Sequence, residues 1–294
     1  MKGLIIINKF STMPSMLNQA NRIKEEFLKR KIDVEIVKNG CFPYLNDYLE
    51  ITNTYKVFDF VVYLDKDKYQ GELIEKSGIR CFNKISAITN CDDKMLTFIK
   101  LAGTGIKVPK TISAPLCYGD YSFDKESLKE VASELKFPLV LKLSFSSLGK
   151  GVFLVNDLNE LYELSKKYKR EAKIYQEYVS SSYGTDIRVI VVGGKVVCAL
   201  KRVSKGDFRS NAALGGYGEK VELNKEYEEL ALKVANNLEL DYMGIDILIG
   251  SNGEPVLCEV NSNAFFNLAE EVTGANVAGS YVEHIINSIY KEKL

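Results

Sequence analysis

The stretch YMGIDILIGSNGEPVLCEVN, residues 242–261, predicts a β-hairpin with acidic side chains on one face. Asn252-Gly253 is a strong signal for a two-residue type I′ turn, so the numbers of opposite residues should add up to 505. Asp246 then lies opposite Glu259, with Cβ atoms about 5 Å apart, and Asn261 shares their face. The other face is expected to be apolar and to cover a core, with Ile245, Ile247, Ile249, Val256, Cys258 and Val260.

Two carboxylates that face each other across a strand pair repel unless a positive charge lies between them. A bound divalent cation would supply that charge. Oxygen ligands without His or Cys suit Mg²⁺ or Mn²⁺, whose coordination is often completed by phosphate oxygens. The alternative is that Asp246 and Glu259 form salt bridges with lysines or arginines on a solvated face. The hairpin alone leaves both interpretations open.

The composition restricts the chemistry. With 294 residues, 46% of them hydrophobic, the chain can bury a large core, and its 39 basic and 39 acidic residues create no global field that would attract nucleic acid or a membrane. There is one histidine, His284, and no C-x-x-C pair, which disfavours zinc, a disulfide framework and a His-based triad. The six cysteines are Cys41, Cys81, Cys91, Cys117, Cys198 and Cys258. Carboxylates, lysines and arginines are therefore the expected functional groups.

The hydrophobic pattern divides the chain into three units. Residues 1–90 are expected to form a parallel α/β domain, with elements at 3–8, 17–30, 34–37, 58–65 and near 79–82. Residues 91–172 follow as a small α+β unit, entered through a linker-like run at 104–115, with elements at 125–136, 138–144, 152–155 and 157–168. Residues 173–294 form the third unit, an α+β unit with two hairpins and helices at 225–238 and at the end of the chain. The first residues, MKGLIIINKF, are too short an apolar run for a signal peptide or a membrane span, so a cytoplasmic protein is expected.

Two segments are candidates for binding phosphate. The loop SFSSLGKG, residues 144–151, follows the strand that contains Lys142 and could place backbone N–H groups and hydroxyls around an anion, although it could equally be a flexible turn. The segment KRVSKGDFRSN, residues 201–211, concentrates positive charge in Lys201, Arg202, Lys205 and Arg209. A solvated loop or a nucleic-acid patch are its alternatives, and the balanced charge and scarce aromatic residues disfavour the second.

The register of the hairpin DIRVIVVGGKVVCALKRV, residues 186–203, decides whether two arginines act together. A two-residue Gly193-Gly194 turn would place Arg188 and Arg202 on opposite faces. A three-residue loop with a bulge would place them on the same face, and we prefer this form.

Several segments, read in order, resemble the RimK branch of the ATP-grasp ligases. They are NKISAITNCDDK (83–94), GIKVPKT (105–111), FPLVLKLSFSSLGKGVFLV (137–155), QEYV (176–179), DIRVIVV (186–192), KRVSKGDFRSN (201–211) and GIDIL with CEVN (244–261). The resemblance implies an α/β and α+β architecture, in which a pre-ATP-grasp domain precedes two α+β subdomains that clamp ATP. After EVN the chain reads SNAFFNLAEEVTG, where glutamate ligases have a small residue and Pro-Gly, which leaves the acceptor substrate open.

The resemblance also implies roles for individual residues. Lys94 and Lys142 would reach the ATP phosphates, Asp186 the ribose, and the backbone at Glu177 and Tyr178 the adenine. Arg188 and Arg202 would hold the acyl phosphate and the γ-phosphate as catalytic residues. The other implied nucleotide contacts are Ser147, Gly149, Gln176, Arg209, Ser210 and Asn211, and the implied metal ligands are Asp246, Glu259 and Asn261.

The function implied is an ATP-dependent carboxylate–amine ligase. ATP and two Mg²⁺ or Mn²⁺ ions would convert a carboxylate to an acyl phosphate, which an amine such as that of glutamate attacks. A small-molecule phosphotransferase and a non-catalytic nucleotide-binding module are the alternatives. No nucleic-acid or membrane partner is expected, and a homo-oligomer is compatible with the resemblance.

Overall fold

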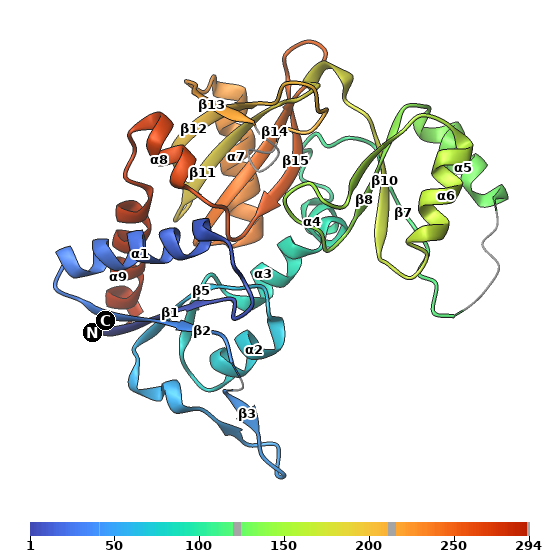
Figure 1. Cartoon of the computed structure of the whole chain (residues 1–294). Helices are drawn as coiled ribbons and strands as arrows, with labels where there is room; N and C mark the ends of the chain where they lie inside the picture. Colours follow the sequence, from blue (N-terminus) through green and yellow to red (C-terminus); the bar gives the residue numbers. More distant parts are fainter. Residues whose placement is uncertain (41, 120–124, 211–215, 293–294) are drawn as a thin grey trace.

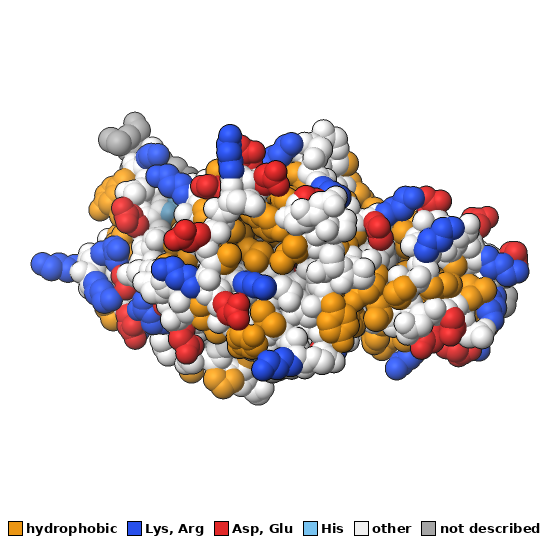
Figure 2. All heavy atoms as spheres, turned by 90° about the horizontal axis from the view of Figure 1, so that it is seen from above, with side chains coloured by type: hydrophobic (Ala, Val, Ile, Leu, Met, Phe, Trp, Pro, Cys, Tyr) orange, Lys and Arg blue, Asp and Glu red, His pale blue; other side chains and the backbone are white. Residues whose placement is uncertain are grey.

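The structure is a computed structural model that describes the chain except for residues 41, 120–124, 211–215 and 293–294. Three sheets with helices packed on them dominate the described part, and the second along the chain forms a lobe of its own, at the right of Figure 1. Among the residues that the structure describes, no helix is long and apolar enough to cross a lipid bilayer. Basic and acidic side chains are interspersed over the face shown in Figure 2, as the equal totals of the two charges suggest.

The first sheet is parallel, in the order β2-β1-β5-β6. Its two central strands, β1 and β5, are short apolar runs that are largely buried, as expected for a sheet covered on both faces, whereas the edge strand β2 has a single buried residue. The sequence prediction of a parallel N-terminal sheet is confirmed. Its elements are β1 (Lys2–Ile7), α1 (Pro14–Lys29), β2 (Asp33–Lys38), β5 (Phe60–Leu64), α2 (Lys68–Lys76), β6 (Arg80–Phe82) and α3 (Ile85–Asp92), with a projecting hairpin of β3 (Tyr44–Leu45) and β4 (Ile51–Thr52) and the short helix η1 (Thr54–Val57).

The second sheet is antiparallel, in the order β7-β10-β8-β9, and α5 (Glu126–Leu135) and α6 (Leu158–Lys167) cover it. Its strands are β7 (Thr111–Ser113), β8 (Leu139–Leu143), β9 (Val152–Val155) and β10 (Lys173–Glu177). Two expectations are corrected here. The run 104–115 contains β7 rather than a simple linker, and β10 belongs to this sheet although the sequence division placed it in the third unit. Alternating apolar residues predict a strand, but they do not say which sheet it joins.

The third sheet is antiparallel, in the order β13-β12-β11-β14-β15. Helices α4 (Lys94–Leu101) and α7 (Lys225–Leu238) pack on one face, where Ile245 and Ile247 are fully buried. On the other face Tyr242 and Tyr281 join a core shared with the first sheet. The remaining elements are η2 (Ser180–Ser182), β11 (Thr185–Val192), β12 (Lys195–Val203), β13 (Tyr217–Lys220), β14 (Tyr242–Ile249), β15 (Pro255–Asn261), α8 (Asn267–Thr273) and α9 (Val277–Glu292).

The acidic hairpin has the predicted pairing but not the predicted turn. Asp246 lies opposite Glu259, as expected, whereas Ile249 lies opposite Pro255, so residues 250–254 connect the strands instead of Asn252-Gly253 alone. Cys258 is an extra residue in β15 and forms a bulge opposite the step from Asp246 to Ile247. From Asp246 to the end of the hairpin away from the turn, the strands therefore pair in the predicted register. The apolar face is corrected accordingly: Leu257 joins the core, while Cys258 and Val256, which lies opposite Leu248, are on the other face.

The other hairpin also contains a bulge. Gly193 and Gly194 form a two-residue turn with φ of 54° and 74°, and Val192 lies opposite Lys195. The register shifts beside Ile190, so Asp186 lies opposite Arg202. Arg188 and Arg202 therefore share one face, as predicted, but the extra residue lies within β12 and not in the turn.

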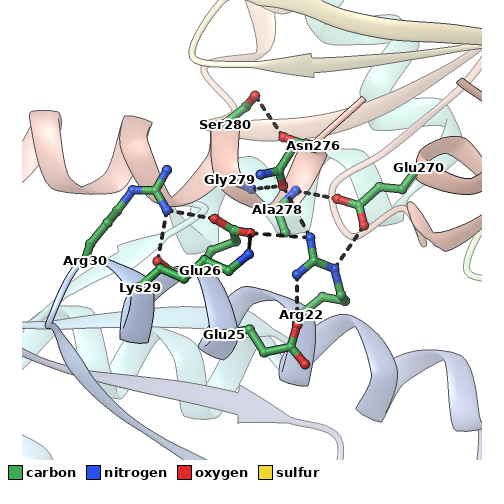
Figure 3. A network of polar contacts seen from close by, with 10 residues as sticks. All are labelled: Arg22, Glu25, Glu26, Lys29, Arg30, Glu270, Asn276, Ala278, Gly279 and Ser280. Carbon is green, nitrogen blue, oxygen red and sulfur yellow. Dashed lines mark hydrogen bonds and ion pairs between the residues drawn. The ribbon is translucent and has the colours of Figure 1, made fainter. Parts of the chain in front are cut away.

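A network of charged side chains ties α1 to the segment that joins α8 and α9 (Figure 3). Glu26 has a side chain only 2% exposed and accepts from Lys29 Nζ at 2.6 Å and Arg30 Nη1 at 2.8 Å. Arg22 Nε lies 3.1 Å from a carboxylate oxygen of Glu270. Burial raises the pKa of Glu26, but hydrogen bonds from Lys29, Arg30 and Asn276 outweigh it and lower that pKa to about 2.

We expect Glu26→Gln to lower the free energy of unfolding by about 2 kcal/mol at pH 7, measured by urea denaturation. The folded-state pKa lies below the ordinary value of 4.5, so the stabilisation is present above pH 4.5 and is lost as the pH falls toward 2. The difference in the free energy of unfolding between wild type and Glu26→Gln should therefore become smaller at acidic pH. Glu25→Gln is the control, because Glu25 is 58% exposed and should have little effect. An equal gap at neutral and acidic pH would contradict this assignment.

Candidate active site

Two connected cavities lie where the second and third sheets face each other. One is lined by residues of the second sheet and its glycine-containing loop together with β11, β12, β14 and β15. The other has a volume of about 530 Å³ and extends toward the first sheet and the start of α1. Four residues line both cavities, namely Ser147, Arg202, Asp246 and Glu259. These residues mark the place where molecules in the two cavities would meet.

Asp246 is at the centre of this junction and is only 4% exposed. Arg188, opposite it on β11, donates from Nε and Nη2 to the two carboxylate oxygens at 2.6 Å each. Arg202 Nη2 lies 2.9 Å from Asp246 Oδ2, and its Nε donates to Asp186 Oδ1 at 2.8 Å. Burial raises the pKa of Asp246, but Arg188 and Arg202 outweigh it and hold that pKa below its ordinary value.

The second carboxylate, Glu259, lies beside Lys94. Lys94 Nζ is 3.7 Å from Glu259 Oε1 and donates to the Ser146 carbonyl oxygen at 2.6 Å. Burial lowers the pKa of Lys94, and Glu259 only partly offsets this effect. Asn261 Nδ2 lies 3.4 Å from Asp246 Oδ2. The structure thus brings the three predicted metal ligands together, with cationic side chains at both carboxylates, and the acidic face borders a cavity rather than a solvated surface.

The donor atoms around this junction are compatible with Mg²⁺ or Mn²⁺. Asp246, Glu259 and Asn261 offer carboxylate and amide oxygens, the ligand type that these ions prefer. A carboxylate accepts about four hydrogen bonds or ligands, and Asp246 already receives three contacts from its arginines and one from Asn261, so a metal ion would have to displace one of these donors. Among the described residues, this site included, no three or more His, Cys, Asp and Glu side chains are grouped so that they could hold a metal ion, so the site offers two carboxylates and one amide. Phosphate oxygens would have to supply the remaining ligands.

Lys142 on β8 is a buried cation without a counter-ion. It is 7% exposed, and within the part of the chain that is described its ammonium forms no ion pair and donates only to Cys258 Sγ at 3.6 Å. A buried charge normally has a partner, so an anion in the cavity would compensate Lys142. This is the position expected of a phosphate-binding lysine.

The loop of residues 144–151 is fixed to the third sheet. Arg209 Nη1 donates to the Gly149 carbonyl oxygen at 2.6 Å, and Arg209 pairs with Asp207 at 2.7 Å. Gly149 has φ 75°, a conformation that favours glycine. Ser147 and Gly149 of this loop line the first cavity, and their contact with a nucleotide stays a prediction.

The first cavity is lined by apolar side chains as well as polar ones. Gln176, Glu177 and Tyr178 border it, and the Glu177 N–H donates to the Lys110 carbonyl oxygen at 2.9 Å. Asp186, Arg209 and Ser210 also line the cavity, whereas Asn211 lies outside the described residues. The sequence prediction missed the lining residues Val140, Val152, Phe208, Leu248 and Cys258. The alternation of β8 could have identified Val140, because it shares a face with Lys142.

Residues 91–285 match the family profile described as a RimK-like ATP-grasp domain. The chain belongs to the RimK-like ATP-grasp family. The predicted family and ATP-grasp architecture are thereby confirmed.

Relatives of this ATP-grasp protein include curated ligases and synthases. Beta-citrylglutamate synthase B of Homo sapiens is 39% identical over 213 residues, which cover 72% of this chain and 54% of the relative. The probable alpha-L-glutamate ligase of Maridesulfovibrio salexigens is 36% identical over 214 residues, which cover 72% of this chain and 68% of the relative. The chain spans about half the length of the first of these relatives.

Solved structures agree on the fold. The D-alanine–D-alanine ligase of Bacillus anthracis, solved in complex with ATP, matches with a TM-score of 0.74 and 20% identity over 99% of this chain and 98% of that one. At this identity the match establishes the fold alone. The ATP-grasp fold therefore includes the N-terminal sheet, which lies outside the residues matched by the family profile.

We expect Asp246→Asn to lower the free energy of unfolding by about 3 kcal/mol in the absence of metal and nucleotide, because two buried guanidinium groups lose their shared counter-ion. Glu259→Gln should cost less than about 1 kcal/mol, because Glu259 is partly exposed and its lysine is 3.7 Å away. Urea denaturation in the presence of a chelator measures both. If the two variants lose equal stability, Asp246 does not stabilise the fold more than Glu259 and this assignment is wrong.

Proposed function

We propose that this ATP-grasp protein is an ATP-dependent ligase that joins a carboxylate to an amine through an acyl phosphate. The observation that supports it most is the junction of the two cavities at Arg202, Asp246 and Glu259. A nucleotide in one cavity and a carboxylate in the other would meet among cations that can stabilise a transferred phosphoryl group. The names of both curated relatives contain glutamate, so glutamate is our first candidate for the amine substrate.

The chain's own residues supply position and charge. Lys142 and Lys94 are suited to hold the ATP phosphates, because both are buried in the wall of the first cavity. Arg188 and Arg202, which lie on one face of β11 and β12, would stabilise the negative charge that develops when the carboxylate attacks the γ-phosphate. The amine then displaces phosphate from the acyl phosphate and forms an amide. ADP and inorganic phosphate are the other products.

Asp246, Glu259 and Asn261 would hold the divalent ions, and we propose two Mg²⁺ or Mn²⁺ ions for this site. When bound, these ions would neutralise charge on the phosphate oxygens. Asp246 would then share its carboxylate between its arginines and a metal ion. The positions of Arg188 and Arg202 would thereby depend on the same residue that binds the ion.

The loop of residues 144–151 would protect the reaction from water. Arg209 holds it against the third sheet through the Gly149 carbonyl oxygen. Exclusion of water matters for a ligase, because an acyl phosphate that meets water is hydrolysed. A nucleotide-binding module would need only the first cavity, so the second cavity, of about 530 Å³, favours a reaction with a further substrate. A phosphotransferase would use both cavities as well, and formation of an amide product distinguishes the ligase from it. A cytoplasmic location, a homo-oligomer and the lack of a nucleic-acid or membrane partner remain predictions of the sequence.

We expect Glu259→Gln to reduce amine-dependent ADP release at saturating Mg-ATP by about a hundredfold or more, because it removes a metal-ligand charge. The substrate pair would come from a screen of amino acids for ATP-dependent phosphate release. Glu219→Gln on exposed β13 is the control and should retain wild-type turnover. Wild-type turnover of Glu259→Gln would reject the metal role, and failure of every amino acid in the screen would reject amino acids, glutamate included, as substrates.

A further inference from the structure

The second cavity contains one charge that the protein leaves uncompensated. Six ionisable side chains line it, namely Asp65, Lys66, Arg188, Arg202, Asp246 and Glu259. Five of them have ion-pair partners: Lys66 with Asp92, Glu259 with Lys94, and both arginines with Asp246. Asp65 forms no ion pair with any residue that the structure describes.

Asp65 is nevertheless buried and rigidly held. It is 4% exposed and directly follows β5. Its Oδ1 accepts from Asn8 Nδ2 at 3.1 Å and the Lys66 N–H at 2.7 Å, and its Oδ2 accepts from Asn39 Nδ2 at 3.1 Å. All three donors are neutral, so they orient the carboxylate without cancelling its charge. A buried carboxylate is costly without a cation, which makes the cavity beside Asp65 a place for a positively charged group.

The position of Asp65 connects it to the predicted metal hairpin. Asn263 Nδ2, two residues beyond Asn261, donates to the carbonyl oxygen of Leu64 at 2.9 Å, and Gln19 Nε2 in turn donates to Asn263 Oδ1 at 3.2 Å. The end of β5 is thereby fixed to the loop that leaves β15. Asp65 also lies at the carboxyl end of a parallel strand, where ligands of open α/β sheets bind.

We propose that Asp65 is the residue that captures the amine substrate in its ammonium form. This inference rests on the proposed ligase function and adds a specificity-determining residue to it. Amines are mostly protonated near neutral pH, so the species that enters the cavity is a cation. The ammonium must release one proton before its nitrogen can attack the acyl phosphate, and in this proposal the Asp65 carboxylate accepts that proton. Asp65 offers it the only uncompensated negative charge among the described lining residues. A substrate that carries no amine should be bound far less well.

The test compares Asp65→Asn with wild type, using the amino acid that is most active in the phosphate-release screen as the amine. Asp65→Asn removes the charge but keeps the size, and should raise the KM for the amine by roughly thirtyfold or more while the KM for ATP stays unchanged. Asp67→Asn is the matched control. Asp67 caps α2 through the N–H groups of Tyr69 and Gln70 and is not among the residues that line the cavity, and asparagine caps helices equally well.

A second comparison uses the des-amino analogue of the same amino acid as an inhibitor. Wild type should bind this analogue much more weakly than the amine, and Asp65→Asn should bind both with similar affinity. The comparison within wild type needs no variant, so it holds even if Asp65→Asn folds poorly. A KM of Asp65→Asn within twofold of wild type, or equal binding of amine and analogue by wild type, would overturn the assignment to Asp65 while leaving the ligase intact. A parallel rise in the KM for ATP would show that Asp65 has a structural role and would also overturn its assignment to the amine. Failure of every amino acid in the screen would reject both amino acid ligation and the role of Asp65 in it.

Discussion

A carboxylate buried between two guanidinium groups depends on both of them, because an ion removed from water is costly unless it is paired. In this ATP-grasp protein the carboxylate is that of Asp246, which Arg188 and Arg202 bind from neighbouring strands. With Asp186 the four side chains form an electrically balanced group in the middle of the third sheet. The same Asp246 lines both cavities and is a proposed metal ligand. The stability of the sheet and the chemistry of the site therefore depend on one residue.

This group exists only because of the strand register. A shift of one residue turns every side chain of a strand to the other face. Each of the two hairpins contains a bulge, one beside Ile190 and one after Asp246, and each bulge corrects the register set by its turn. Without the bulges, Arg202 and Glu259 would face away from Arg188 and Asp246. The loop of residues 144–151 and the end of β5 then complete the cavity around this face.

Much of this arrangement could be predicted from the sequence, but partly through compensating errors. The pairing of Asp246 with Glu259 followed from a two-residue turn that does not exist, because the longer connection and the bulge at Cys258 offset each other. Hydrophobic alternation identified β10 as a strand but did not assign it to the second sheet. The ion pairs of Asp246 and the uncompensated charge of Asp65 involve residues far apart in the sequence, and no local pattern reports such contacts. Asp65 was detectable only as a polar residue at the end of a buried strand, a signal that many surface residues share.

In the proposed reaction the carboxylate substrate is activated by direct attack on the γ-phosphate of ATP beside Asp246. The most direct measurement follows oxygen-18 from a labelled carboxylate substrate during one round of ligation. We expect one labelled oxygen to leave in the inorganic phosphate and the other to stay in the amide, and the nucleotide product to be unlabelled ADP. Label in AMP, or a stable phosphorylated substrate without amide, would contradict it.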